Sequence, residues 1–279
     1  VYEDYLEKTF SFPNVYKHLM DQFSSGIAMF CEGRAFTLSM AMKVIGELMR
    51  LVTRSRQLEK AGPFQSSDAE FKKRIQHLFD NMGLLLSQHD EKLKISQMEL
   101  LRNLHKCYKP LMELMTKREI ADHVRDVITR LPKAKDLPVE IRRTKMEFIQ
   151  KTVNSDLFRE DESRSTLLSL CLNHIKGCLI ERHFLDIQIA TSILGDILET
   201  LFNLQETKGI CQDINTVALS LFEVLVQSIS KMADGELFNP HPTAYPLVTL
   251  RKPTISEISS PYATTDQKRS SKVPIIVGS

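Results

Sequence analysis

The sequence predicts an all-α fold in which antiparallel helix pairs stack into an armadillo- or HEAT-like α-solenoid. Apolar residues recur at helical spacing in one segment after another from about Glu32 to Met232. Short polar or proline-containing breaks separate these segments, which come in pairs roughly forty residues apart. Helix pairs of this period cannot bury their apolar faces alone, so they stack on their neighbours. A compact helical bundle is the structural alternative, and no segment has the period of a strand.

Three helical regions are expected in the first part of the chain. Tyr2 to Phe10 has the pattern of a helix end, and Asn14 to Phe23 has an apolar residue at every fourth position. A long helix is expected from about Arg34 to Glu59, with Val44 on its apolar face. Gly62-Pro63 ends that helix.

Capping boxes mark three helix starts in the middle of the chain. In such a box a Ser or Thr hydroxyl accepts from the amide three residues later, and a Glu at that later position reaches back. Each is worth about 1 kcal/mol. The pairs are Ser67 with Glu70, Ser96 with Glu99 and Thr116 with Glu119. Pro110 is expected to kink or split the second helix, and Pro132 to end the third.

Four further helices are expected before the composition of the chain changes. They span about Val139 to Val153, Ser163 to Glu181, Asp186 to Leu204 and Ile214 to Met232, with a loop from Asn154 to Asp161. Leu198 and Ile229 are expected to face the interior. Six of the eleven prolines lie from Pro240 onward, among many Ser and Thr residues. We therefore expect a helical domain at 1–235 and a disordered linker or tail at 236–279.

Overall composition excludes several classes of protein. Lys and Arg number 37 against 35 Asp and Glu, so the net charge of +2 gives no general attraction to nucleic acid or membranes. No apolar run is long enough for a transmembrane helix. The chain begins without Met or a signal-like segment, which indicates a piece of a longer protein. Scattered cysteines suit reduced core thiols in a cytosolic protein; they are Cys31, Cys107, Cys171, Cys178 and Cys211.

No motif indicates catalysis, a metal or a cofactor, so we expect none of the three. The eight histidines form neither HExxH nor a zinc-type Cys/His cluster, and surface or half-buried roles are expected for them. Glycine-rich phosphate-binding motifs are missing as well. The carboxylates of Glu160, Asp161 and Glu162 resemble a metal or acid site, but they precede a helix, where the helix dipole favours negative charge.

One local cluster of basic residues is a candidate contact patch for an acidic partner or anionic lipid headgroups. It consists of Lys133, Lys135, Arg142, Arg143 and Lys145. The alternative is an ordinary solvated turn and helix face, since Glu140 and Glu147 partly cancel the charge. In the tail, serines beside basic residues or proline are candidate phosphorylation sites; these are Ser260, Ser270 and Ser271.

Several strings of residues resemble the dedicator-of-cytokinesis (DOCK) family in its helical armadillo-like region. The closest run is Thr152 to Phe158, followed by Asp161 to Arg164, Leu167-Leu168 and Asn173 to Ile175. Supporting matches are Ala41 to Ile45, Val52 to Arg56 and Phe71 to Phe79. The resemblance covers about Val1 to Met232 and is greatest to the branch that works with ELMO adaptors on Rac. The matching positions are packing and loop residues, so no catalytic residue is carried over.

The resemblance implies a parent protein that is a guanine nucleotide exchange factor for a Rho-family GTPase, acting in actin remodelling, migration or engulfment. It implies a cytoplasmic protein recruited peripherally to the plasma membrane, with the flanking domains and an ELMO-type adaptor as partners and no nucleic acid. This chain would then be a non-catalytic scaffold. A freestanding HEAT- or armadillo-type adaptor or trafficking scaffold is the alternative function. An enzyme with a site assembled from distant residues is a third, which no polar cluster supports.

Overall fold

The computed structural model describes residues 2–31, 38–63, 66–132, 136–181, 184–206 and 209–233. Within these ranges the chain is all-α, without a strand. The α-helices are α1 (Tyr2–Lys8), α2 (Val15–Cys31), α3 (Leu38–Lys43), α4 (Ile45–Ala61), α5 (Asp68–Ser87), α6 (Lys94–Asn103), α7 (Tyr108–Met112), α8 (Lys117–Thr129), α9 (Val139–Val153), α10 (Asp156–Arg159), α11 (Asp161–Glu181), α12 (Phe184–Asn203) and α13 (Ile210–Ala233). Two 3₁₀ helices, η1 (Glu91–Leu93) and η2 (Leu104–Cys107), flank α6.

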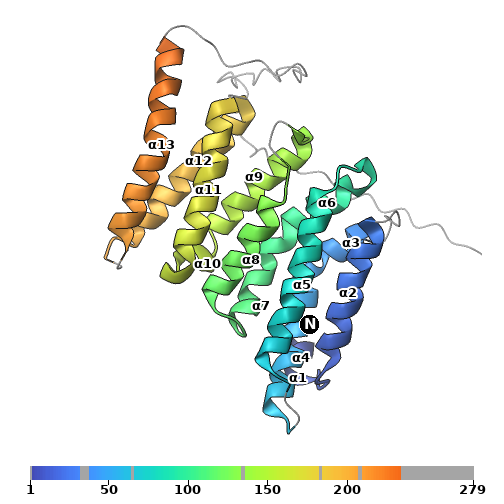
Figure 1. Cartoon of the computed structure of the whole chain (residues 1–279). Coiled ribbons are helices and arrows are strands. Elements are labelled where there is room, and N and C mark those ends of the chain that lie inside the picture. Colours follow the sequence, from blue (N-terminus) through green and yellow to red (C-terminus); the bar gives the residue numbers. More distant parts are fainter. Residues whose placement is uncertain are drawn as a thin grey trace, which may run out of the picture. The chain divides into compact units, whose positions relative to one another are not determined.

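The helices stack in two rows, which confirms the predicted solenoid. In the first row α2 packs on α5, α5 on α8, α8 on α11 and α11 on α13. In the second row α3 packs on α6, α4 on η2, α6 on α9 and α9 on α12. Figure 1 shows this order as a progression from blue through green to orange. The long helices α8, α9, α11, α12 and α13 alternate between the rows, whereas α3 and α4 follow one another in the second row. Each layer contacts its neighbours.

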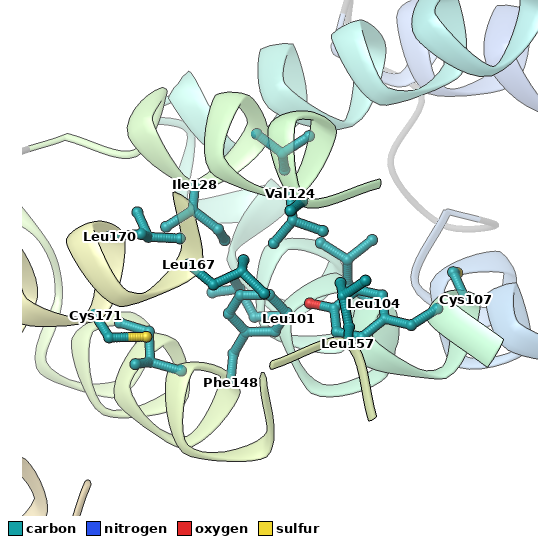
Figure 2. Close-up of a cluster of buried hydrophobic side chains, with 14 of the residues drawn as sticks. Leu101, Leu104, Cys107, Val124, Ile128, Phe148, Leu157, Leu167, Leu170 and Cys171 are labelled. Atoms are coloured by element: carbon teal, nitrogen blue, oxygen red, sulfur yellow. The ribbon is translucent and has the colours of Figure 1, made fainter. Parts of the chain in front are cut away.

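The core is a continuous band of apolar side chains between the two rows. Figure 2 shows its central part, where Phe148 of α9 lies among residues of α6, α8 and α11. Leu101, Val124, Ile128 and Leu167 in this cluster are at most 1% exposed. Burial of a side chain of this size contributes about 1.5–3 kcal/mol. The apolar stripes predicted from the sequence therefore hold the layers together.

The prediction of one helix from Arg34 to Glu59 was wrong, because the described residues form two helices there, α3 and α4. The chain breaks at Val44, whose backbone angles are φ −102° and ψ 13°, and whose side chain is 52% exposed. The break lets α3 pack on α6 while α4 packs on η2. A methyl group at Gly46 would lie 2.6 Å from Cβ of Lys106, so the backbones of α4 and η2 approach too closely for a larger residue.

Two of the three predicted capping boxes mark real helix starts. Thr116 and Glu119 form the complete box at α8. Ser67 accepts from the amide of Glu70 at 3.1 Å and starts α5. The prediction for Ser96 was wrong, because Ser96 is buried inside α6. The chain enters this region through η1, which is capped by the carboxylate of Asp90.

The other predicted boundaries differ from the structure by a few residues or by one short helix. The helix from Val139 to Val153 has the predicted bounds. Pro110 lies in α7, after η2 has interrupted the helical path, so the predicted split is confirmed. The predicted loop from Asn154 to Asp161 contains α10. The predicted tail at 236–279 and its boundary lie outside the described residues.

Candidate interaction surfaces

The structure separates the residues of the predicted basic cluster. Arg143 lies on the exposed side of α9 and pairs with a glutamate one turn further along. Arg142 and Lys145 are buried. Lys133 and Lys135 lie outside the described residues, as do the predicted phosphorylation sites Ser260, Ser270 and Ser271. The described members of the cluster are therefore not brought together on one surface.

Arg142 joins two neighbouring helices of the second row. Its Nε lies 2.7 Å from Oδ2 of Asp186 at the start of α12, and both side chains are buried. The N–H does not point along this line, so the contact is an ion pair without an aligned hydrogen bond. Lys145, one turn further along α9, has no carboxylate within ion-pair distance in the described ranges. Burial lowers the pKa of Lys145 to about 8, because removal from water disfavours the charged amine.

A second buried arginine ties together α10, α11 and α13. Arg164 is fully buried, and its Nε donates to Oδ2 of Asp213 at 2.6 Å. Its Nη2 donates to Asp161 at 2.7 Å, and its Nη1 to the carbonyl of Arg159 at 3.0 Å. The rigid fork of a guanidinium can satisfy three such acceptors at once, which an ammonium group cannot do in the same plane.

A third buried arginine lies where α2, α4 and α5 meet. Arg56 forms an ion pair with Glu59, and both residues are almost fully buried. Glu59 also accepts from Tyr16 and Ser66, each at 2.9 Å, and pairs with Lys17 at 3.0 Å. Burial of Glu59 opposes its ionisation, but the hydrogen bonds from these four side chains outweigh burial and lower its pKa to about 2. The carboxylate is thus held charged as part of a structural network.

The acidic residues before α11 have structural partners. Glu160 pairs with Lys117 of α8 at 2.5 Å, and Asp161 accepts from Arg164. Asp161 and Glu162 lie in the first turn of α11, where the helix dipole favours negative charge. This arrangement agrees with the capping role expected from the sequence.

Histidine and cysteine side chains in the described ranges do not assemble a reactive site. No group of three or more His, Cys, Asp or Glu residues there could hold a metal ion. Burial lowers the pKa of His105 to about 4 and that of His174 to about 3, so both rings are neutral at physiological pH. Cys107, Cys171 and Cys178 are free and buried, and burial raises the pKa of each thiol to about 12. Cys211 is free and exposed, and the side chain of Cys31 lies outside the described part.

A groove of about 350 Å³ lies between α1, α4 and α7. Its lining carries both signs of charge, and its two arginines already have partners. Arg50 pairs with Glu3 at 2.9 Å, while Arg54 donates to the carbonyls of Leu6 and Glu7. These contacts fasten α1 to α4, so the groove offers little that is free to select a ligand.

The last two described helices, α12 and α13 (Figure 1), carry exposed large apolar side chains, and we call this set of residues the end face. The end face consists of Leu198 and Phe202 of α12 with Leu219, Phe222, Val226 and Ile229 of α13. The predictions that Leu198 and Ile229 face the interior were wrong, since they are 47% and 66% exposed. A second apolar stripe on α13, spaced by three and four residues, was the signal for this surface in the sequence.

The described part of the chain is thus a stacked helical solenoid in which buried ion pairs join neighbouring helices. No helix in this part is both long and apolar enough to span a membrane. The class of protein defined by these features is an all-α helical solenoid. Residues 1–260 match the family model described as the DOCK TPR region, and the chain belongs to the dedicator-of-cytokinesis family.

Comparison with two curated relatives shows what share of their length this chain covers. It is 27% identical over 192 residues to dedicator of cytokinesis protein 3 of Mus musculus and of Homo sapiens, covering 68% of this chain and 9% of the relative. It is 25% identical over 233 residues to dedicator of cytokinesis protein 4 of Mus musculus, covering 82% of this chain and 12% of the relative. The chain therefore spans about a tenth of the length of these relatives.

Proposed function

We propose that this chain is a non-catalytic helical scaffold segment of a DOCK-family guanine nucleotide exchange factor. In this proposal its GTPase is Rac, of the Rho family, and its role lies in actin remodelling, migration or engulfment. The observation that carries this proposal is the two-row stack of the described residues, in which three buried arginines join helices. Family membership supplies the expected parent activity.

The scaffold holds the flanking domains of the parent protein at fixed spacing. Arg56 pairs with Asp68, Arg142 with Asp186 and Arg164 with Asp213, and each of these pairs joins two helices of the stack. ELMO-type adaptors and the GTPase are partners of the parent protein in this proposal, and nucleic acid is not a partner. The parent protein is cytoplasmic and is recruited peripherally to the plasma membrane.

Release of a fluorescent guanine nucleotide from Rac tests the proposal. The purified 279-residue chain is compared with the parent protein at equal concentration, and its helical content is checked by circular dichroism. We expect a helical chain that leaves the release rate at its intrinsic value, while the parent protein accelerates release. Acceleration by the chain alone would contradict a scaffold role.

A further inference from the structure

A cavity of about 400 Å³ lies between α5 and α8, which are neighbours in the first row (Figure 1). Each of these helices has a further helix of the row on its other side, α2 for α5 and α11 for α8, so both walls are complete within the described residues. Sites for small ligands begin at about 300 Å³, so the cavity has room for one long side chain. Its charged and titratable lining residues are Lys72, Lys73, Glu119, Asp122, His123 and Asp126.

His123 is a polar side chain without a partner in the wall of this cavity. It is 9% exposed, and its ring lies against that of Phe79, with the ring centroids 5.1 Å apart. The ring forms no hydrogen bond with the described residues, and neither of its nitrogens is among their fully buried unpaired atoms. The nitrogens therefore reach the cavity that the ring lines. A ligand group in the cavity can pair with this ring.

Carboxylates determine the charge around His123. Burial lowers the pKa of His123, so the ring is neutral at physiological pH and does not repel a cation. The charges that act on it most strongly are all negative and oppose this shift; they belong to Asp126, Glu119, Asp122 and Asp80. The field at this wall of the cavity therefore favours a positively charged ligand group.

The two lysines of the lining leave this negative charge in place. Lys72 of α5 pairs with Glu119 of α8 at 2.6 Å, so these two charges balance each other and join the two walls. Lys73 is exposed, and water and salt screen its charge. Neither lysine therefore removes the preference for a cation beside His123.

Asp122 and Asp126 have carboxylate oxygens to offer. Nη1 of Arg125 lies 2.8 Å from Oδ1 of Asp122, and Nη2 lies 3.0 Å from Oδ1 of Asp126. One guanidinium thus balances one of two carboxylates and leaves a net negative charge. Oδ2 of each aspartate has no partner among the described residues. The two acceptors lie one helical turn apart on α8.

We propose that the cavity between α5 and α8 binds an arginine side chain of a partner protein, with Asp122 and Asp126 pairing with its guanidinium beside the ring of His123. The planar fork of a guanidinium can donate to two acceptors at once, which an ammonium group does less well. No group of three or more His, Cys, Asp or Glu residues in the described ranges could hold a metal ion, so an organic cation is the matching ligand. This inference rests on the proposed scaffold function and adds to it a contact site for a partner.

The acetylated and amidated peptide Ala-Ala-Arg-Ala-Ala serves as the probe. Its binding to the 279-residue chain is followed by NMR through the ring signals of His123, which are identified by their loss in His123→Gln. We expect the peptide to shift these signals with a dissociation constant on the order of 1 mM. Citrulline in place of arginine keeps the shape and removes the charge, so this peptide should bind roughly tenfold more weakly.

Three results with these ligands would overturn the proposal. Equal binding of the citrulline peptide would show that charge is not recognised. Tighter binding of a peptide with Glu in place of Arg would show that Lys73 selects an anion. Tighter binding of free arginine than of the peptide would assign the cavity to a small molecule instead of a partner protein.

Matched substitutions locate the binding site. Asp126→Asn should weaken binding of the arginine peptide roughly tenfold, because Arg125 then balances the charge of Asp122. Asp156→Asn is the control and should leave binding unchanged, since Asp156 also pairs with an arginine of its own helix but lies on α10. Circular dichroism of each variant must match the unsubstituted chain. Unaltered binding to a folded Asp126→Asn variant would overturn the proposal.

Lys73→Glu gives a second test that does not remove a native ion pair. It adds negative charge to the opposite wall at an exposed position, so it should strengthen binding of the arginine peptide. Weaker or unchanged binding would contradict the proposed site. None of these outcomes bears on nucleotide release from Rac, so failure of this inference and failure of the scaffold role are distinguishable.

Discussion

At the scale of single residues, the most consequential side chains are the buried charges. Glu59 is surrounded by four hydrogen-bonding side chains, which include the guanidinium of Arg56. Removal of Glu59 takes away the buried carboxylate partner of Arg56 and leaves it the exposed carboxylate of Asp68, and breaking a buried pair in this way costs about 3–5 kcal/mol. We therefore predict that Glu59→Gln lowers the free energy of unfolding by about this amount at pH 7, measured by urea denaturation.

The effect of Glu59→Gln should depend on pH. The lowered pKa of Glu59 means that the unfolded state binds more protons between its ordinary value of about 4.3 and the folded value of about 2. The stabilisation is complete above the unfolded pKa and is lost as pH falls toward the folded pKa. Glu91→Gln is the control, because Glu91 is exposed. A difference between the variants that persisted unchanged below pH 2 would contradict this account.

Lys145 presents the opposite case, a buried cation without a carboxylate partner among the described residues. We predict that Lys145→Met stabilises the fold at pH 7, by about 2–3 kcal/mol, because it removes the charge and keeps a side chain of similar length. The lowered pKa places the penalty fully below pH 8 and removes it as pH rises toward the ordinary value. The gain from Lys145→Met should therefore shrink between pH 8 and pH 10.5 in thermal unfolding. A constant gain across this interval would argue against charge burial as its cause.

Sequence reasoning singled out Arg142, Arg143 and Lys145 but not their roles, and it did not single out Glu59. The cluster from Lys133 to Lys145 is basic in sequence, yet Arg142 and Lys145 point inward while Arg143 points outward. Basic residues that are close in sequence can point to opposite sides of a helix, because each residue turns about 100° round the axis. A cluster of charges in the sequence therefore does not show which side chains reach the surface. The partner of Arg142, Asp186, lies far away in sequence, so a pattern within one helix could not reveal the pair.

At the scale of single elements, helix existence was predictable and helix interruptions were not. Thr116 and Glu119 start α8 as expected, because a capping box is satisfied locally. The break at Val44 accompanies contacts with helices distant in sequence, because α3 packs on α6 and α4 on η2. Helix α10 packs mainly on its neighbours α9 and α11, and its four residues are too few for an apolar period. Ser96 and Glu99 match the pattern of a box, but burial of Ser96 inside α6 overrides it.

Two glycines test how closely the elements approach each other. A methyl group at Gly46 would meet Cβ of Lys106, whereas one at Gly177 would meet no atom within 4 Å. We predict that Gly46→Ala destabilises the fold by about 1–3 kcal/mol, because α4 and η2 must move apart. Gly177→Ala should stabilise it by up to about 1 kcal/mol, since alanine favours the helix. Equal effects of the two substitutions in urea denaturation would contradict this interpretation of the α4–η2 contact.

At the scale of the whole described solenoid, stability is distributed through contacts between adjacent layers. Phe148 lies in the central cluster, so Phe148→Ala should cost about 3–5 kcal/mol. In a nearest-neighbour stack the loss should be greatest in the layers that touch α9. Hydrogen exchange should therefore increase more in α6, α9 and α12 than in α2. A uniform increase over all helices would indicate instead that the stack unfolds as one unit.

The two-row architecture followed from the sequence more readily than its surfaces did. The apolar period and the breaks between segments predict helix pairs. A pair that cannot bury its apolar faces alone must stack on the next pair. The end face escaped prediction because Leu198 and Ile229 continue the apolar pattern of buried residues, and the pattern does not distinguish a covered side from an exposed one. Only the packing of α13 on α11 makes its outer side evident.

The stacking of helices from α2 to α13 also determines how the length of the solenoid changes when a layer is added. Packed helix axes lie about 8–10 Å apart, so every added layer lengthens the stack by one such step without altering the contacts within other layers. Duplication or loss of a helix pair would therefore change the length of the stack and leave its fold unaltered. Under the proposed scaffold function, the distance between the flanking domains would change in steps of one layer.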